Sequence, residues 1–310
     1  MLLVVAAAAG AVTPFVLRLH EKSHAATAPR APAKPPPAKA HASPAERAVQ
    51  PRIFASLVGP LPTARLLAPP VAARAAIVVD TRSGRVLWSR HAHRRVAIAS
   101  TTKIMTAVLA LQRLRPNDVV TVNPLATRVP LVKEGLRPRE RVRAWKLFDG
   151  LLMYSGNDDA LALAIAAAGS RAGFVRLMNE EARALGLADT HFSTPSGVID
   201  SQNYSSAWDL AALTRYALRD ARFRRIVRTR IVHVPWSPPT YEKVYVNKNA
   251  LLGRYRGADG VKTGWTTVAG HCLVASATRH GRTIVAVLLD DRDVYDDARR
   301  LLDLGFSTRA

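Results

Sequence analysis

The order of predicted elements indicates an α/β protein with one antiparallel sheet built from both ends of a folded region. Short β-type runs lie near residue 75, and the pattern returns to β-type runs after residue 244. Between them the apolar residues recur with helical spacing. The sequence therefore predicts a sheet with a helical block inserted between its first and last strands.

The strands at the two ends are predicted as hairpins. Residues 75–79 and 86–88 are apolar runs, and the turn-forming stretch 80–84 separates them. Near the C-terminus, His280-Gly281 provides a hairpin turn between the last two strands. The later strands are expected over residues 244–246, 260–262, 271–277 and 283–289, and a helix over residues 296–304 follows them.

The inserted block shows helical periodicity in several consecutive stretches. Gly169-Ser170 separates two of the helices, because glycine and serine favour helix ends. The predicted helices cover residues 104–114, 143–153, 158–168, 172–185 and 207–218, and an Arg-rich helix is expected around residues 222–230.

The N-terminus has a different composition. Residues 2–17 are almost wholly apolar but too short for a membrane span of ~20 residues, which favours an export signal. Ala26-Thr27-Ala28 offers a small-residue cleavage site, whereas Arg18 follows the apolar run instead of preceding it. We therefore expect a signal peptide or short N-terminal anchor over residues 1–28. A periplasmic or otherwise extracytoplasmic location follows, with N-terminal attachment to the inner membrane left open.

A Pro/Ala-rich basic linker is predicted over residues 29–70, because such a composition buries too little apolar surface to fold. The folded, catalytic unit is expected over residues 71–310. The formal net charge of +22 favours an anionic envelope polymer or lipid as a contact, or only an Arg-rich solvated surface. No nucleic-acid recognition motif accompanies this charge. A single cysteine, Cys272, leaves no cysteine cluster for a metal, and neither a metal nor another cofactor is expected.

Three short motifs, each at an element boundary, carry the candidate chemistry. Ser100-x-x-Lys103 is expected at the start of the first long helix. Ser155-Gly156-Asn157 is expected between two helices, and Lys262-Thr263-Gly264 at the end of a strand. Serine needs a base within hydrogen-bond reach, and positions i and i+3 share one helix face. Lys103 can act as that base if burial or a nearby cation such as Lys262 removes its proton.

The third motif adds groups suited to an acyl substrate. Lys262 and the Thr263 hydroxyl offer a charge and a donor to a carboxylate, and Gly264 permits close approach of an extended peptide. The backbone N–H of Trp265, with that of Ser100, can form an oxyanion hole. Each motif alone is common, and only their combination in this order indicates catalysis.

The flanking residues extend these motifs into a specific likeness. Residues 98–107, 154–158 and 259–266 resemble the three active-site segments of the D-alanyl-D-alanine carboxypeptidases, the low-molecular-mass penicillin-binding proteins. Residues 194–197 and 247–252 add non-catalytic likeness. The resemblance implies a β-lactamase/transpeptidase-like fold with a five-stranded antiparallel sheet flanked by helices. It also implies a serine peptidase that removes the terminal D-alanine from peptidoglycan stem pentapeptides.

By the same resemblance, Ser100 forms an acyl-enzyme with Lys103 as its base. Ser155 and Asn157 position the substrate and relay a proton to the departing amine. Lys262 and Thr263 hold the terminal carboxylate, and β-lactams acylate Ser100 as covalent inhibitors. The expected partners are therefore peptidoglycan stem peptides and β-lactams.

Three other functions remain open. A DD-endopeptidase cuts peptidoglycan crosslinks with the same constellation, and a penicillin-sensing module would bind without catalysis. A class A β-lactamase needs a deacylating glutamate between the second and third motifs. Only Glu180, Glu181 and Glu242 lie there, in a predicted helix and before a predicted strand.

Overall fold

The computed structural model describes residues 56–59, 69–198 and 202–308. The predicted leader and most of the predicted linker lie outside the described residues. Within the linker range, Val58 is placed beside the first hairpin, where its N–H donates to the Gly84 carbonyl at 2.9 Å. Its own carbonyl accepts from Val86 N–H at 2.9 Å. The end of the predicted linker therefore pairs with the sheet.

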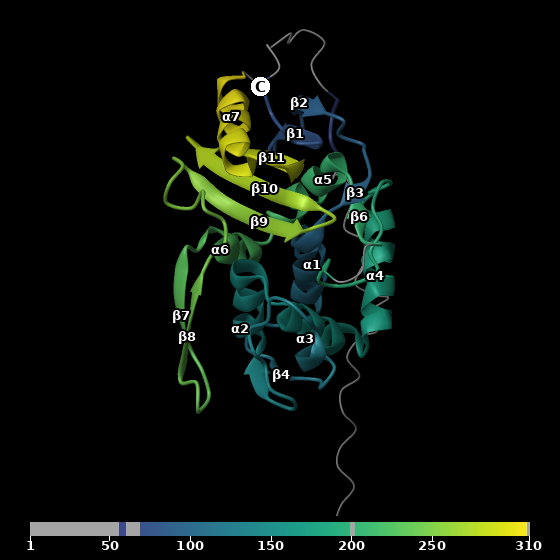
Figure 1. Ribbon diagram of the computed structural model, residues 1–310, viewed down its shortest axis with the longest axis vertical. Helices are drawn as coiled ribbons and strands as arrows, with labels where there is room; N and C mark the ends of the chain where they lie inside the picture. Colours follow the sequence, from purple (N-terminus) through teal and green to yellow (C-terminus); the bar gives the residue numbers. More distant parts are fainter. Residues whose placement is uncertain (1–55, 60–68, 199–201, 309–310) are drawn as a thin grey trace, which may run out of the picture. The chain divides into compact units, whose positions relative to one another are not determined.

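The main sheet has five antiparallel strands in the order β2-β1-β11-β10-β9 (Figure 1). At its centre, strands from the beginning and the end of the folded region lie side by side, since Ala75 of β1 pairs with Leu289 of β11. This confirms the sheet that the sequence predicts. The strands are β1 (Ala75–Asp80), β2 (Val86–Arg90), β9 (Ala258–Thr266), β10 (Gly270–Arg279) and β11 (Arg282–Asp291).

Both faces of this sheet are covered, which explains why β1 and β11 are apolar at consecutive positions. On one face, Leu273, Ile284 and Leu288 pack against α7 (Val294–Ser307). On the other face, Val274 and neighbouring side chains pack against the inserted helices. Burial of the strand on two sides removes the usual alternation of apolar and polar residues.

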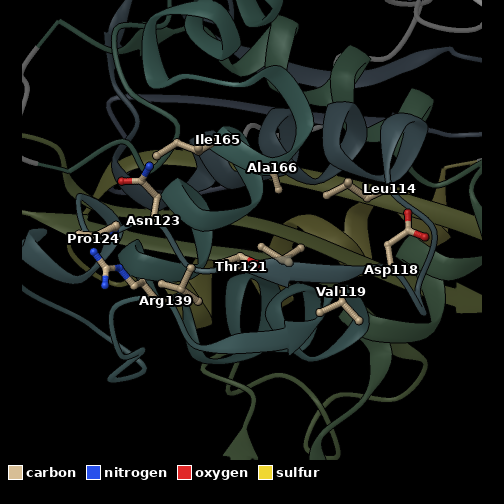
Figure 2. A pocket seen from close by; sticks show the side chains of 11 residues that line it. Leu114, Asp118, Val119, Thr121, Asn123, Pro124, Arg139, Ile165 and Ala166 are labelled. Atoms are coloured by element: carbon tan, nitrogen blue, oxygen red, sulfur yellow. The ribbon is translucent and has the colours of Figure 1, made fainter. Parts of the chain in front are cut away.

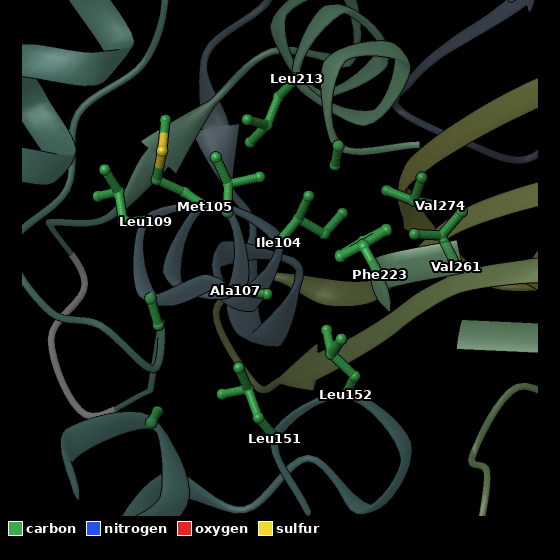
Figure 3. Packing of buried hydrophobic residues seen from close by; sticks show 14 of the residues in the cluster. Ile104, Met105, Ala107, Leu109, Leu151, Leu152, Leu213, Phe223, Val261 and Val274 are labelled. Atoms are coloured by element: carbon green, nitrogen blue, oxygen red, sulfur yellow. The ribbon is translucent and has the colours of Figure 1, made fainter. Parts of the chain in front are cut away.

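The inserted block is built around α1 (Lys103–Arg113), whose side chains are buried through Leu111. Figure 3 shows Ile104 and Ala107 of this helix among Leu151, Leu152, Leu213, Phe223 and Val261. Apolar contact with helices and sheet therefore fixes the helix that begins at the first motif. The other helices of the block are α2 (Ala144–Asp149), α3 (Asn157–Ala168), α4 (Arg171–Ala184), α5 (Ala207–Ala217) and α6 (Ala221–Arg228).

Three two-stranded sheets complete the described part of the chain, and most of their strands escape the sequence prediction. They pair β3 (Val96–Ala97) with β6 (Tyr204–Ser205), β4 (Val119–Thr121) with β5 (Arg141–Arg143), and β7 (Ile231–Pro235) with β8 (Glu242–Val246). Short 3₁₀ turns cover Ala99–Thr102 (η3) and Ala126–Arg128 (η4), and a π-helical turn covers Gly150–Tyr154 (η5).

Two local predictions need correction. Ser100 lies in the 3₁₀ turn η3, and the α-helix itself begins at Lys103. The third motif lies inside β9 rather than at its end, because pairing with β10 continues to Thr266 and Gly270. In the described part of the chain, no single helix is long and apolar enough to cross a membrane; α3 and α4 together pass on length and composition but are bent by 85°.

Candidate active site

Ser100 lies where η3 meets the inner face of β9. The preceding residue, Ala99, has a left-handed backbone with φ of +44°, so the chain turns sharply into the serine. Gly264 of β9 packs against this turn, and a Cβ there would lie 2.9 Å from Ser100 N. Gly197 closes the other side, where a Cβ would overlap the Ala99 carbonyl. Backbone packing therefore fixes the serine between two glycines.

The Lys103 amine is the centre of the site. Its Nζ lies 2.9 Å from Ser100 Oγ, 2.9 Å from Asn157 Oδ1 and 3.0 Å from the Ser196 carbonyl oxygen. The amide and backbone oxygens can only accept hydrogen bonds, so they take two N–H groups. A neutral amine has two N–H groups and one lone pair. Its lone pair is thus left to accept the Ser100 hydroxyl proton.

The electrostatic surroundings of Lys103 favour that neutral form. Its side chain is fully buried. Burial, and then the positive charge of Lys262, hold the pKa of Lys103 well below its usual range. Asp158 and Asp159 oppose this, since a negative charge there raises the pKa of Lys103. Burial and the neighbouring Lys262 are the two causes that the sequence analysis names for a neutral Lys103, and its role as the base stays a prediction.

The second motif reaches the same amine through Asn157. Ser155 ends η5 with a left-handed backbone, φ of +73°, and is 5% exposed. The Asn157 side chain donates from Nδ2 to the Pro130 carbonyl at 3.0 Å, which orients Oδ1 toward Lys103. Asn157 N–H also donates to the Val132 carbonyl at 2.8 Å. The loop before β5 therefore holds the asparagine in place.

Lys262 of the third motif is buried beside the site. Its Nζ donates to the Thr263 carbonyl at 3.1 Å, and its side chain is 1% exposed. Burial and the nearby Lys248 lower the pKa of Lys262 to about 7. The amine is therefore poised to gain a proton when an anionic group arrives, because a negative charge nearby raises a lysine pKa.

The last predicted residue, Trp265, follows Gly264 on β9 and is 57% exposed. Its ring lies 6.2 Å from that of His271, its cross-strand neighbour. The indole contributes little to the core, so the predicted role of Trp265 depends on its backbone N–H.

Sequence reasoning missed three contributors to the site. The Ser196 carbonyl accepts from Lys103, Pro130 supplies the carbonyl that orients Asn157, and Lys248 acts on both buried lysines. Residues 194–197 and 247–252 stand out in the sequence for their likeness to the family. The likeness predicts no catalytic role for these segments, although it is the one signal in the sequence that points to Ser196 and Lys248.

Other candidates lie in ordinary structural positions. Glu180 and Glu181 belong to α4 and Glu242 begins β8, as the sequence predicts. Cys272 is a buried strand residue. A groove of about 410 Å³ runs between the end of α1, β4 and α3, and its lining contains none of the predicted site residues (Figure 2). No group of three potential metal ligands occurs among the described residues.

The profile of the D-alanyl-D-alanine carboxypeptidase family matches residues 63–293. The chain belongs to this family. It is 31% identical over 245 residues to D-alanyl-D-alanine carboxypeptidase DacF of Bacillus subtilis, covering 76% of this chain and 62% of the relative. The chain thus spans less than two thirds of the length of that relative.

Solved structures agree with this membership. A D-alanyl-D-alanine carboxypeptidase from Mycobacterium tuberculosis H37Rv superposes with a TM-score of 0.74 at 34% identity, covering 78% of this chain and 93% of the other. A mutant of the Streptomyces K15 DD-transpeptidase gives a TM-score of 0.73 at 31% identity, covering 77% and 100%. The penicillin-binding fold predicted from the sequence is therefore confirmed, including its five-stranded antiparallel sheet.

Proposed function

We propose that this chain is a serine D-Ala-D-Ala carboxypeptidase that acts on peptidoglycan stem pentapeptides. The observation that carries the proposal is the Lys103 amine, which lies between Ser100 Oγ and two oxygens that can only accept. This geometry supplies a base directly at the nucleophile. Family membership supplies the class of substrate.

In the acylation step, Ser100 Oγ attacks the carbonyl carbon of the penultimate D-alanine while its proton passes to Lys103 Nζ. The backbone N–H groups of Ser100 and Trp265 stabilise the developing oxyanion; such a donor contributes ~3–4 kcal/mol. The C–N bond then breaks, and the departing amine takes a proton from Lys103 by way of Ser155. The product is a Ser100 ester and free D-alanine.

Substrate recognition rests on the third motif. The terminal carboxylate is held by Thr263 and by Lys262, whose amine gains a proton as the anion arrives. The extended peptide lies along β9, which is an edge strand of the five-stranded sheet. Water then attacks the ester carbonyl, and Lys103 accepts the water proton and returns it to Ser100 Oγ.

A paired assay tests this proposal. The purified chain should release D-alanine from a stem pentapeptide and bind labelled penicillin covalently, and Ser100→Ala should abolish both. Penicillin labelling without D-alanine release would favour a penicillin-sensing module. Cleavage of crosslinked dimers but not of pentapeptides would favour the DD-endopeptidase, and transfer of the acyl group to an added amine would favour a transpeptidase.

We further propose that the chain acts outside the cytoplasm, because its substrate is the cell wall and residues 1–28 have an export-signal pattern. Fusing residues 1–70 to a reporter that is active only after export tests this. Resistance of the fusion to alkaline extraction would indicate an uncleaved anchor, whereas release would indicate cleavage. An inactive reporter would contradict the proposal.

Contact with an anionic envelope polymer is also proposed, through the exposed arginines of α6, which are Arg224, Arg225 and Arg228. Retention on an anionic polymer column that falls with added salt would support it. Unchanged retention after all three are replaced by glutamine would contradict it.

A further inference from the structure

Two carboxyl groups lie behind the second motif and take no part in the mechanism above. The first, Asp159, is fully buried in the first turn of α3. Gly150 and Gly156 leave room for it, since a Cβ at either position would overlap its Oδ2. The carboxyl group is thus wedged against the turn that carries Ser155. Its sequence neighbour Asp158 differs, because its oxygens accept from backbone N–H groups of the loop at 134–136.

The second carboxyl group belongs to Glu134, whose side chain is 1% exposed. All four oxygens of Glu134 and Asp159 are buried, and across the described ranges none of them accepts a well-aligned hydrogen bond from elsewhere in the chain, although the Lys243 amine forms an ion pair with Glu134. Two buried carboxylates with a single lysine to serve them would be costly in free energy. A single proton shared between them removes one charge and supplies the missing donor.

The ion pair with Lys243 favours the charge on Glu134 and therefore the proton on Asp159. Burial, then the charge of Glu134 and a hydrogen bond to it, raise the pKa of Asp159 well above its usual range. Lys243 of β8 forms an ion pair with Glu134, the other carboxyl group of the pair, with Nζ 3.3 Å from Glu134 Oε1. The Lys243 amine is fixed in turn over the Trp236 ring, 3.8 Å from its centroid. One shared proton and the positive charge of Lys243 therefore offset the negative charges of the two carboxyl groups.

Charged groups on the surrounding elements respond to this balance. On α2, burial lowers the pKa of Lys146 and raises that of Asp149, and the charge of Glu134 opposes the first change and adds to the second. On α3, Asp158 adds to the raised pKa of Asp159. On α1, a negative charge on Asp159 would raise the pKa of Lys103 and so favour the protonated amine.

We propose that Glu134 is a positioning residue, which by sharing a proton with Asp159 keeps Asp159 neutral and thereby leaves Lys103 as a neutral base. The inference rests on the proposed function only in needing Ser100 to be acylated through Lys103. Acylation by labelled penicillin is therefore the readout, and release of D-alanine is not required.

The test compares isosteric variants of the full chain by the pH dependence of their acylation rate. Glu134→Gln leaves Asp159 facing an amide donor and Lys243, so Asp159 ionises. The rise of the rate with pH should then move to higher pH by about one unit, the effect of one nearby charge. Below that rise, the rate at a fixed pH should fall about tenfold.

Two further variants separate charge from packing. Asp159→Asn carries no charge and should not move the rise to higher pH. The double variant Glu134→Gln/Asp159→Asn should return it to the wild-type position, a rescue that lost packing would not give. Glu180→Gln, at an exposed side chain of α4, is the matched control and should leave the profile unchanged.

The inference would be overturned if folded Glu134→Gln had the wild-type pH dependence of acylation. It would also be overturned if the rise of the rate lay at the same pH in the double variant as in Glu134→Gln. Infrared spectroscopy of the wild-type chain gives a test that needs no folded variant of Glu134. A protonated carboxyl band should persist well above pH 6, where Asp149 and Asp291, with pKa values raised to about 6, have ionised. Absence of that band would also overturn it, and an unacylated wild-type chain would instead refute the proposed function.

Discussion

The Asn203 side chain links two turns of the site. One is the turn at 193–197, whose Ser196 carbonyl accepts from Lys103, and the other is η3, which carries Ser100. Removal of this side chain should weaken both the fold and the site. Its Oδ1 accepts from Ser193 N–H at 2.9 Å, from the Ser193 hydroxyl at 2.6 Å and from Thr194 N–H at 2.9 Å. Its Nδ2 donates to Thr102 Oγ1 at 3.1 Å and to the Thr194 carbonyl at 3.0 Å. The side chain is 2% exposed.

Asn203→Ala removes these five hydrogen bonds from a buried place. At ~1 kcal/mol net for each bond, and with partial rescue by water at half-buried Ser193, the free energy of unfolding should fall by about 3–5 kcal/mol. For a domain of this size that lowers the thermal midpoint by about 10 °C. Because Thr102 lies in the Ser100 turn, acylation should also slow by ~10- to 100-fold.

Urea unfolding and penicillin acylation, measured well below the thermal midpoints, check the two effects. Asn179→Ala is the matched control, since Asn179 also bonds backbone groups, those of Phe192 and Val175, but does not touch the Ser100 turn. It should lose about 2–3 kcal/mol with an unchanged acylation rate. A slowed Asn179→Ala, or an Asn203→Ala as stable as wild type, would refute the reasoning.

Four other substitutions give distinct outcomes. Lys103→Arg should abolish penicillin acylation while the chain stays folded, because a guanidinium keeps its proton; labelled acyl-enzyme formed by this variant would contradict the base assignment. Peptide affinity should weaken as the pH rises through about 7, where free Lys262 loses the proton that attracts the carboxylate, and Lys262→Arg should remove this dependence in binding titrations. Gly264→Ala should block acylation, since its Cβ meets Ser100 N at 2.9 Å. Trp265→Ala, at an exposed ring, should change the free energy of unfolding by less than about 0.5 kcal/mol and preserve acylation, as circular dichroism and labelling would show.

The sequence predicts elements well where burial imposes a period. The helix over α5 (Ala207–Ala217) and the runs of β1 and β11 stand out because their apolar side chains face a core. The strands β4 and β7 do not, since Val119 and Ile231 are exposed and the pairs are short. Each of these strands, like its partner, has a single fully buried residue, so burial imposes no clear apolar period on it.

Some groups of the site can likewise be predicted from the sequence and others cannot. Ser100 and Lys103 are predictable because the i, i+3 spacing alone brings them together, and the structure places them 2.9 Å apart. The Ser196 carbonyl is not, because a backbone group has no residue type to identify it. Glu134 and Asp159 resemble surface acids in the sequence, and only the fold shows that both are buried.

The pairing of β1 with β11 has a consequence for how the chain is made. These strands lie more than 200 positions apart, as in the pair Val78 and Ala286, and β1 is enclosed between β2 and β11. Ribosomes deliver the N-terminal end first, so β1 waits without β11 until more than 200 further residues have been synthesised. The helices around α1 can associate earlier through nearer contacts, but β9 follows the Ser100 turn by more than 150 residues. A nascent chain therefore holds no assembled nucleophile until β9 emerges.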